Sequence, residues 1–496
     1  MNRKKSIFIL LLLCVLMIPA TYASASDVIG NNKNGIPDKG LYRDILNKLG
    51  KKPKETFTRQ EAEQIRSLSV YSNIKNIKGI KYLKNLKKLS IEGKRLKSLN
   101  GIQGLKKLEV INMSDNNIKS LKPLKNLKNL KKLDASQNRL KSTSGLEKLK
   151  NLKELNLERN QLESIKDLKD LTNLNRVNLY FNNLGSLKGL GKQKKLVFLD
   201  ASWNELTGIK ELKELKSLEF LDLSRNRITS LKGLKKQKKL TELYINRNRL
   251  TGMQEVGNLT KLKELDAKEN YIKGLQGMGK LKNLVRLDVS FNDLESLHDI
   301  QNMRKLKLLD ATDNRLTKVD EAASIKSLEY LFIGFNQITD LPDLKAHPKL
   351  KSVIFGYNLI NQTEAELREK LPNAYLSVKN SLFKSNLKEQ NINYTIDFME
   401  PSSIELISTN TTKISGRVHM PVEKIQITLD ENLNDDDEFK TEYFANVDEN
   451  GYFVFENLNF KRFAGGKCDL DILMCFEYNE EYKQYTGRFL RSYQLR

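Results

Sequence analysis

The sequence predicts an α/β-type solenoid with a curved parallel β-sheet on its inner side and 3₁₀ turns or loops on its convex side. A small α-helical N-terminal cap precedes it and an all-β domain follows it. Three observations predict this fold. Asparagines recur every 22 residues, apolar residues alternate just before each of them, and the period ends near residue 380, where strand-like segments take over. A fixed period of this length is the signature of stacked repeats.

Each period reads LxxLxLxxNxL, as in LKELNLERNQL at 152–162, which is the pattern of leucine-rich repeats. The LxL half alternates at period two and indicates a short strand with its leucines facing inward. The other half places apolar residues every three positions, which suits 3₁₀ turns or extended segments. One asparagine per coil is expected to bond backbone groups buried at the turn. This structural ladder comprises Asn116, Asn138, Asn160, Asn182, Asn204, Asn226, Asn248, Asn270, Asn292, Asn314, Asn336 and Asn358, and Lys94 holds the same place one period earlier.

The sequence divides into a signal peptide, two caps around the repeats, and a C-terminal domain. A basic start, a short apolar run and Ala23-Ser24-Ala25 as a cleavage site predict export. The predicted parts are 1–25 (signal peptide), 26–64 (helical N-terminal cap), 65–361 (leucine-rich repeats), 362–379 (C-terminal cap of the solenoid and linker) and 380–496 (β-sandwich).

The caps are predicted to be helical. Leu41, Ile45 and Leu49 are spaced as on one face of a helix, so the segment 36–50 is expected to cover the first coil. Two capping-box patterns, Thr58 with Glu61 and Thr363 with Glu366, are expected to begin further short helices at either end of the repeats.

The C-terminal domain is predicted to be an immunoglobulin-like β-sandwich, because segments such as TKISGRV and GYFVF alternate and are separated by turns. Cys468 and Cys475 would lie ~23 Å apart in one extended strand. A disulfide needs Cα atoms within ~7 Å, so they are interpreted as core thiols. The acidic segment 431–438 is interpreted as a solvated loop in preference to a cation site. The three histidines are scattered, and no metal site or cofactor is predicted.

The side chains between the inward strand residues face the concave side. The column four positions before each ladder asparagine carries Asp134, Asp200, Asp222, Asp266, Asp288, Asp310 and Phe332. Flanking columns add the aromatic residues Tyr180, Phe181, Phe198, Trp203, Phe220, Tyr244, Phe291, Tyr330, Phe335 and Tyr357. Neighbouring like charges repel, and grouped aromatic residues mark interaction sites, so these residues are predicted to bind a ligand. The alternative is that aspartate merely suits the turn and the rings lie on neighbouring aliphatic stems.

The net charge of +25 is unevenly spread. Residues 26–379 carry 70 basic and 41 acidic side chains, whereas residues 380–496 carry 13 and 20. Lysines crowd the convex side, which is either a plain solvated surface or one attracted to anionic cell-wall polymer or glycosaminoglycan. Nucleic acid is not expected, because the signal exports the chain and the inner face is acidic. Gln193, Gln237 and His347 replace leucines, which predicts looser packing at the convex edge.

The order of signal, helical cap, 22-residue repeats and β-sandwich resembles the internalin family of bacterial surface and secreted proteins. The resemblance implies a solenoid whose concave face binds a host or surface protein, with the sandwich as a rigid support. Many internalins end in an LPxTG wall-sorting signal, whereas this chain ends RFLRSYQLR. A secreted protein without a membrane span, held to the envelope at most by charge, is therefore expected.

Three functions compete on this evidence. The first is a non-enzymatic protein-binding protein that acts as an adhesin or virulence factor. The second is an envelope-associated structural protein retained on anionic wall polymer by its basic convex face. The third is an enzyme using paired carboxylates such as Asp200 and Asp222, which would lie ~5 Å apart on adjacent strands. An open sheet lacks the enclosed pocket that catalysis needs, so no enzyme is predicted.

Overall fold

The computed structural model describes residues 27–372, residues 375–377 and the strands between residues 405 and 495. The predicted signal peptide and the acidic loop at 431–438 lie outside the described residues. The repeat array divides between two compact units. The first extends to Leu240, and the second begins at Thr241 and also takes in Ile228–Leu231.

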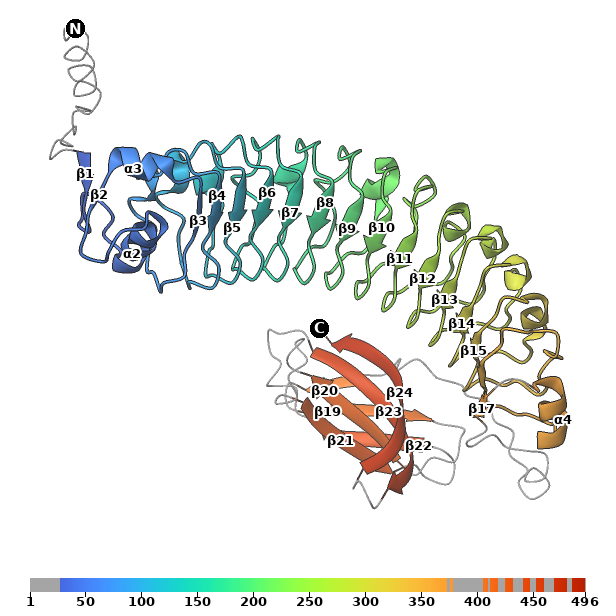
Figure 1. Ribbon diagram of the computed structural model, residues 1–496. Coiled ribbons are helices and arrows are strands. Elements are labelled where there is room, and N and C mark those ends of the chain that lie inside the picture. Colours follow the sequence, from blue (N-terminus) through green and yellow to red (C-terminus); the bar gives the residue numbers. More distant parts are fainter. Residues whose placement is uncertain are drawn as a thin grey trace, which may run out of the picture. The chain divides into compact units, whose positions relative to one another are not determined.

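In the first unit, three-residue parallel strands follow one another in chain order (Figure 1). Each strand pairs with the next in a register of 22 residues, except that Ser67 pairs with Lys88, 21 residues on. The first coil is therefore one residue shorter than the others, as the sequence indicates. The strands are β3 (Ser67–Ser69), β4 (Lys88–Ser90), β5 (Val110–Asn112), β6 (Lys132–Asp134), β7 (Glu154–Asn156), β8 (Arg176–Asn178), β9 (Phe198–Asp200) and β10 (Phe220–Asp222).

The repeat strands of the second unit are also parallel, and a helix lies between the last two of them in the chain. This helix, α4 (Glu364–Lys370), begins at Thr363 with the predicted capping box to Glu366. The strands are β11 (Glu242–Tyr244), β12 (Glu264–Asp266), β13 (Arg286–Asp288), β14 (Leu308–Asp310), β15 (Tyr330–Phe332), β16 (Ser352–Ile354) and β17 (Tyr375–Ser377).

The core lies behind the strands, where the inward residues of each coil stack. Leu199 and Ala201 are fully buried, as are the leucines spaced by three in the opposite half of the coil, such as Leu212 and Leu215. Burial of one such leucine contributes roughly 1.5–3 kcal/mol. The predicted 3₁₀ turns are present at Ile80–Tyr82, Ile102–Gly104, Lys122–Leu124, Lys166–Leu168, Lys210–Glu214, Val256–Asn258, Met278–Lys280, Ile300–Asn302 and Asp320–Ser324.

The asparagines bind consecutive coils together. Nδ2 of Asn160 donates to the carbonyl oxygens of Ala135, Leu157 and Glu158 at 3.0–3.1 Å, and Oδ1 accepts from the backbone N–H of Leu140 at 3.0 Å. Asn336 repeats the pattern at the same offsets. Both hydrogen-bonding ends of the amide are thus used, and each asparagine fastens its own coil to the preceding one.

The N-terminal cap replaces this ladder with buried carboxylates. It comprises helices α2 (Lys39–Lys48) and α3 (Arg59–Gln64) and an antiparallel pair, β1 (Val28–Ile29) with β2 (Phe57–Thr58). Asp38 caps α2 and also accepts from the backbone N–H of Lys75 at 2.7 Å. Asp44 accepts from the N–H groups of Tyr71 and Ser72, both at 2.8 Å. These acids satisfy turn groups of the first coil.

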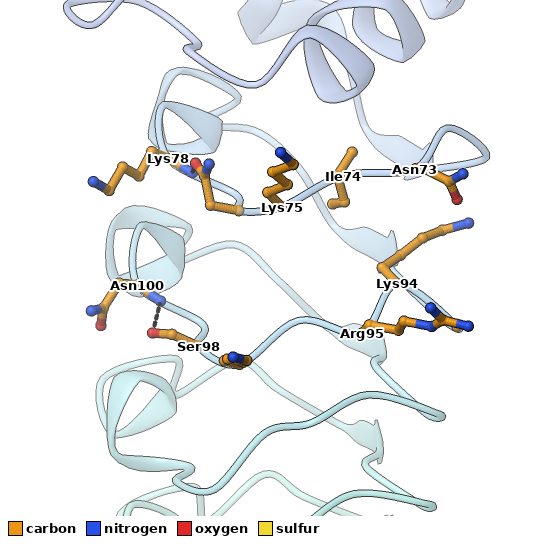
Figure 2. Close-up of a pocket in the computed structure, with 11 residues that line it drawn as sticks. Asn73, Ile74, Lys75, Lys78, Lys94, Arg95, Ser98 and Asn100 are labelled. Carbon is orange, nitrogen blue, oxygen red and sulfur yellow. Dashed lines mark hydrogen bonds between the residues drawn. The ribbon is translucent and has the colours of Figure 1, made fainter.

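The second coil departs from the ladder, because Lys94 stands where later coils have asparagine. Its Nζ donates to the carbonyl oxygen of Tyr71 at 3.1 Å, so one cation replaces part of the missing amide (Figure 2 shows Lys94 with the loop of the preceding coil). Arg95, the next residue, has a left-handed backbone with φ of 53°. The junction between the first two coils is therefore irregular.

The expectation of looser packing at the convex edge was wrong for the polar residues that replace leucine. Gln193, Gln237 and His347 are buried. Nε2 of Gln193 donates to the carbonyl oxygen of Leu168 at 2.8 Å, and Gln237 bonds Leu212 in the same way. In all three residues Nε2 contacts a backbone carbonyl oxygen one coil back, whereas Oε1 of Gln237 and Nδ1 of His347 are buried without a hydrogen-bond partner among the described residues.

The C-terminal strands form two antiparallel sheets. One has the order β18–β19–β22 and the other β21–β20–β23–β24. Cys468 and Cys475 lie in the single strand β23, paired with β20 along that stretch, so the extended backbone keeps them apart as predicted. The immunoglobulin-like arrangement stays a prediction. The strand bounds are β18 (Glu405–Ser408), β19 (Thr411–Arg417), β20 (Lys424–Asp430), β21 (Lys440–Asn446), β22 (Tyr452–Leu458), β23 (Cys468–Asn479) and β24 (Gln484–Leu495).

Candidate functional site

The candidate site is the open sheet face, defined as the side chains at the first and third positions of each repeat strand together with the turn that follows the strand. At the third position, Oδ1 of an aspartate or asparagine accepts from the backbone N–H two residues on. Asp200 does so from Ser202 at 3.0 Å and accepts from its Oγ at 2.6 Å. The same turn bond is made by Asn112, Asp134, Asn156, Asn178, Asp222, Asp266, Asp288 and Asp310. All six aspartates of the column thus have the local turn role that the sequence left open.

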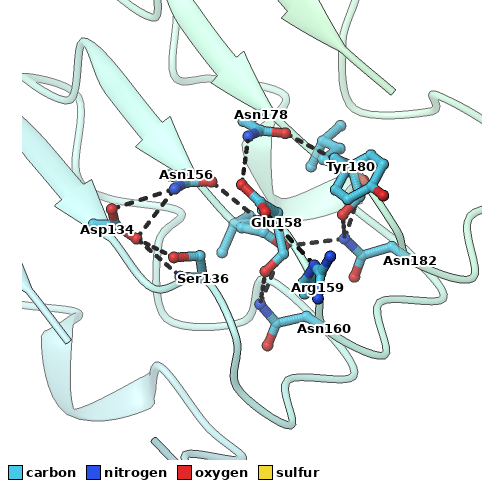
Figure 3. Close-up of polar contacts among 11 residues, drawn as sticks. Asp134, Ser136, Asn156, Glu158, Arg159, Asn160, Asn178, Tyr180 and Asn182 are labelled. Atoms are coloured by element: carbon cyan, nitrogen blue, oxygen red, sulfur yellow. Dashed lines mark hydrogen bonds and ion pairs between the residues drawn. The ribbon is translucent and has the colours of Figure 1, made fainter. Parts of the chain in front are cut away.

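Where the column carries amides, its polar groups bond one another. Nδ2 of Asn156 lies 3.2 Å from both carboxylate oxygens of Asp134 on the preceding strand, and Nδ2 of Asn178 donates to Glu158 at 3.1 Å (Figure 3). Two strands that carry asparagine therefore separate Asp134 from Asp200, the next aspartate of the column, and Asp134 has the amide of Asn156 as its partner.

Asp200 and Asp222 occupy paired positions on β9 and β10, with no amide between them. Burial, and then the charge of Asp200, raise the pKa of Asp222 to about 6. Burial also raises the pKa of Asp200. This pair therefore holds a proton more readily than free aspartate, and a protonated carboxyl can donate a hydrogen bond as well as accept one.

In the second unit, Asp266, Asp288 and Asp310 are paired in register on three consecutive strands. Burial and the neighbouring charge of Asp288 raise the pKa of Asp266 to about 7 and raise that of Asp310. Tyr244 is paired with the first of the three and Phe332 with the last. The acidic row is thus bounded on both sides by rings.

The aromatic residues of the first unit form two clusters. At the turns, the rings of Tyr180 and Phe181 lie 6.5 Å and 5.6 Å from that of Trp203, measured between centroids. At the first strand position, the rings of Phe198 and Phe220 stack at 4.5 Å. All five side chains are half-buried, because they cover one another while part of each ring remains at the surface.

The second unit has its own aromatic residues. The rings of Phe335 and Tyr357 stack at 4.0 Å, and those of Tyr330 and Phe332 lie 6.3 Å apart. Phe291 occupies the same turn position as Phe335, two coils earlier, and is also half-buried.

Several of these rings sit on strained backbone. The residue before each ladder asparagine is left-handed, a conformation that costs a non-glycine residue roughly 1–2 kcal/mol. The aromatic residues at this position and their φ angles are Phe181 (55°), Trp203 (51°), Phe291 (55°), Phe335 (56°) and Tyr357 (58°). Glycine or asparagine would suit the turn better, so the fold alone does not call for these rings.

The structure adds cations that the sequence reasoning missed. Cζ of Arg176 lies 4.1 Å from the centroid of Phe198, and Cζ of Arg225 lies 4.0 Å from that of Trp203. Arg176 also lines a shallow hollow of about 220 Å³ across β6 to β9, together with Lys132 and Glu154, whose charged groups are 2.8 Å apart. The alternation that placed the aspartates outward also places these first-position residues outward, and could have identified them.

Metal binding and membrane spanning receive no support from the described part of the chain. No group of three or more histidine, cysteine, aspartate or glutamate side chains there is arranged to hold a metal ion. Among the same residues, no helix has the length and apolar character needed to cross a membrane.

The repeats match a known protein family. The family described as "Leucine Rich repeats (2 copies)" matches residues 106–148, 128–170 and 304–346. No curated protein sequence matches the chain. Together with the sheet and its asparagine ladder, this match defines a leucine-rich repeat solenoid protein.

Two of the solved structures with a similar fold are internalins of Listeria monocytogenes. Internalin InlF of Listeria monocytogenes is 25% identical with a TM-score of 0.59, over 71% of this chain and 98% of that one. InlJ of the same species shares the fold at 19% identity and a TM-score of 0.56, over 90% and 96% of the two chains. The GASSHO1/SCHENGEN3 receptor ectodomain of Arabidopsis thaliana, solved in complex with CASPARIAN STRIP INTEGRITY FACTOR 2, also shares the fold. It is 23% identical with a TM-score of 0.51, over 64% of this chain and 45% of that one. In the fold of its leucine-rich repeats, the chain is therefore similar to the internalins.

Proposed function

We propose that the protein is a secreted, non-enzymatic binding protein that recognises a protein ligand on its open sheet face, in the manner of an internalin-like adhesin or virulence factor. The recognition elements are the two aromatic clusters of the first unit, the Asp200–Asp222 pair beside them, and the acidic row of the second unit with its flanking rings. In each unit taken by itself, acidic and aromatic side chains lie together, which fits a ligand that presents basic and apolar groups.

The observation that carries the proposal is the placement of Trp203. Its backbone is left-handed, and its ring nevertheless packs between Phe181 and the guanidinium of Arg225 at the surface. The left-handed backbone recurs before every ladder asparagine, so what favours a binding role is the choice of a large aromatic side chain at this half-buried position, where the turn itself requires none. Tryptophan, tyrosine and arginine are also the residues that dominate binding energy at protein interfaces.

The acidic pairs support the same face. Carboxylates aligned on adjacent strands repel one another, so they lower the stability of the sheet at neutral pH. A basic group of a ligand placed over Asp200 and Asp222 would relieve this repulsion, so binding and the local electrostatics favour each other. The GASSHO1/SCHENGEN3 ectodomain, which has a similar fold, was solved in complex with CASPARIAN STRIP INTEGRITY FACTOR 2, and this supports a binding role for a leucine-rich repeat scaffold.

The test is capture of a ligand by residues 26–496 from host-cell and bacterial-envelope extracts, at low and moderate salt. The ligand is then identified and its affinity measured with purified components. The triple variant Phe198→Ala, Trp203→Ala, Phe220→Ala is expected to lose at least about 2 kcal/mol of binding free energy, about 30-fold in affinity, since it removes the central rings.

Two matched variants locate the effect. Tyr71→Ala removes an aromatic side chain that is 83% exposed and lies outside the aromatic clusters, and it is expected to bind normally. The triple Tyr330→Ala, Phe335→Ala, Tyr357→Ala reports whether the second unit contributes. Unchanged binding in both triple variants would refute the proposal, and salt-labile capture of wall polymer alone would favour the envelope-associated alternative.

A further inference from the structure

A basic pocket lies between the first two coils, in a part of the molecule that the proposed function does not use. Its volume is about 710 Å³, within the range that accommodates a small ligand. Its lining includes five cationic side chains: Lys75, Lys78, Lys94, Arg95 and Lys97. Figure 2 shows that the labelled residues come from two consecutive coils, one contributing 73–78 and the next 93–100.

The pocket arises from the irregular junction of these coils. The first coil is one residue short, and Lys94 replaces a ladder asparagine. Gly93 occupies the left-handed turn position, with φ of 66°, where the following coil has Asp115. A missing side chain, a missing amide and a shortened turn together leave room that the regular coils fill.

The cations of the pocket have no acidic counterparts within ion-pairing distance. Among the described residues, none of the five forms an ion pair within 4 Å, whereas many lysines elsewhere in the repeats do, such as Lys131 with Glu109. Two acids nearby are engaged in hydrogen bonds: Glu92 accepts from Asn112 at 2.8 Å, and Asp38 accepts from backbone N–H groups.

The five cationic side chains line one pocket along its length, with Lys78 toward one end and Lys94 and Arg95 toward the other (Figure 2), so an extended anion lying in the pocket can contact several of them. Lysine and arginine bind tetrahedral oxyanions through several N–H donors at once.

We propose that this pocket binds the oxyanion groups of a polyanionic glycopolymer, either sulfate groups of a sulfated glycan or phosphodiester groups of a polyol-phosphate chain. The site is a built pocket with defined residues, distinct from general attraction to lysines on the convex side. It would add a second contact to a protein that recognises its protein ligand elsewhere, without depending on that ligand.

The test measures binding of two fluorescent probes, a heparin octasaccharide and a glycerol-phosphate oligomer, to residues 26–496 at 0.05, 0.15 and 0.5 M NaCl. The pocket variant is Lys75→Gln, Lys78→Gln, Lys97→Gln. The control variant is Lys106→Gln, Lys128→Gln, Lys150→Gln, which removes the same charge from exposed lysines one coil apart on the convex side. Thermal unfolding confirms that both variants are folded.

The pocket variant is expected to lose about tenfold or more in affinity at 0.15 M NaCl and the control about twofold at most, because only close charges act strongly in water. The probe that binds more tightly identifies the source of the oxyanion. Equal losses in both variants, no loss in the pocket variant, or no binding of either probe at 0.05 M NaCl would overturn the proposal.

Discussion

The guanidinium of Arg225 covers the ring of Trp203, with Cζ 4.0 Å from the ring centroid. Both residues occupy the turn position before a ladder asparagine, one coil apart, and both have left-handed backbones, with φ of 52° and 51°. The repeat geometry therefore brings a cation and a ring together at a fixed spacing. Such cation–π contacts contribute about 0.5–1 kcal/mol at exposed sites.

Substitutions at Trp203 are expected to reverse the usual order of alanine and glycine. Trp203→Ala loses the ring contacts and keeps the strained φ, whereas Trp203→Gly loses the same contacts and removes the strain. The glycine variant should be more stable by about 1 kcal/mol, opposite to the ordinary preference. Chemical denaturation of both variants measures the difference, and a more stable alanine variant would show that the turn carries no strain.

Asp266→Asn is expected to change the pH dependence of stability. The pKa of Asp266 is about 7 in the folded protein, against an ordinary value of 3.8, so the folded state binds more protons between about pH 4 and 7. Its contribution to stability is therefore favourable below about pH 4 and is lost as pH rises through 7. Asparagine keeps the turn bond to Lys268 and carries no charge. The variant should be more stable than wild type at pH 8 by on the order of 1–2 kcal/mol, and the difference should be smaller at pH 5 and vanish below about pH 4.

Asp134→Asn is the matched control for this pH prediction. The register neighbours of Asp134 are Asn112 and Asn156, and Asn156 donates to its carboxylate. The substitution removes an acceptor and relieves no repulsion, so it should be slightly destabilising at pH 8. Thermal unfolding at pH 5 and pH 8 measures both variants, and a stabilised Asp134→Asn protein would argue against repulsion as the cause.

Asn160→Ala is expected to destabilise the array strongly. It leaves the buried backbone N–H of Leu140 without its partner, at about 1–3 kcal/mol, and removes one of the two amide donors to the carbonyl of Ala135, the other being Nδ2 of Asn138. Asn117→Ala removes the same side-chain type at a half-buried position with one weak bond, 3.5 Å to the carbonyl of Arg95, and should cost less than about 0.5 kcal/mol. Comparable denaturation midpoints for the two variants would contradict the ladder's role.

Gln193 and Gln237 occupy the same convex position but are expected to respond oppositely to leucine. Oε1 of Gln193 accepts from the backbone N–H groups of Gly191 and Lys192, whereas Oε1 of Gln237 is buried with no partner among the described residues. Gln237→Leu should therefore stabilise the protein by about 1 kcal/mol and Gln193→Leu should destabilise it by a similar amount. The free energies of unfolding of the two variants measure these effects. Effects of the same sign would contradict the explanation that the hydrogen bonds of Oε1 set the difference.

The repeat could be predicted from sequence because one physical need recurs in every coil. Leucines alternate where the strand faces the core, and asparagine returns wherever a tight turn leaves backbone groups unpaired. The caps were predictable for a related reason, since helical spacing and the Thr58–Glu61 and Thr363–Glu366 pairs are local signals.

What sequence could not supply depends on contacts between coils. The burial of Gln193 and the cation over Phe198 become visible only when residues 22 or more positions apart are brought together. The turn bond from Ser202 to Asp200 is local, and it was one of the two alternatives that the sequence left open. The basic pocket is a still harder case, because it follows from a one-residue shortening and two substitutions that each look minor alone.

The asparagine ladder also implies an order in which the coils can become stable. Each asparagine reaches back 20 and 25 residues to complete the coil before it, as Asn160 does for Leu140 and Ala135, and none of these bonds needs a later coil. The first coil is completed by Asp38 and Asp44, which precede it in the chain. A chain made or delivered N-terminus first can therefore lock each coil as soon as the following asparagine emerges, and its newest coil is always the loosest.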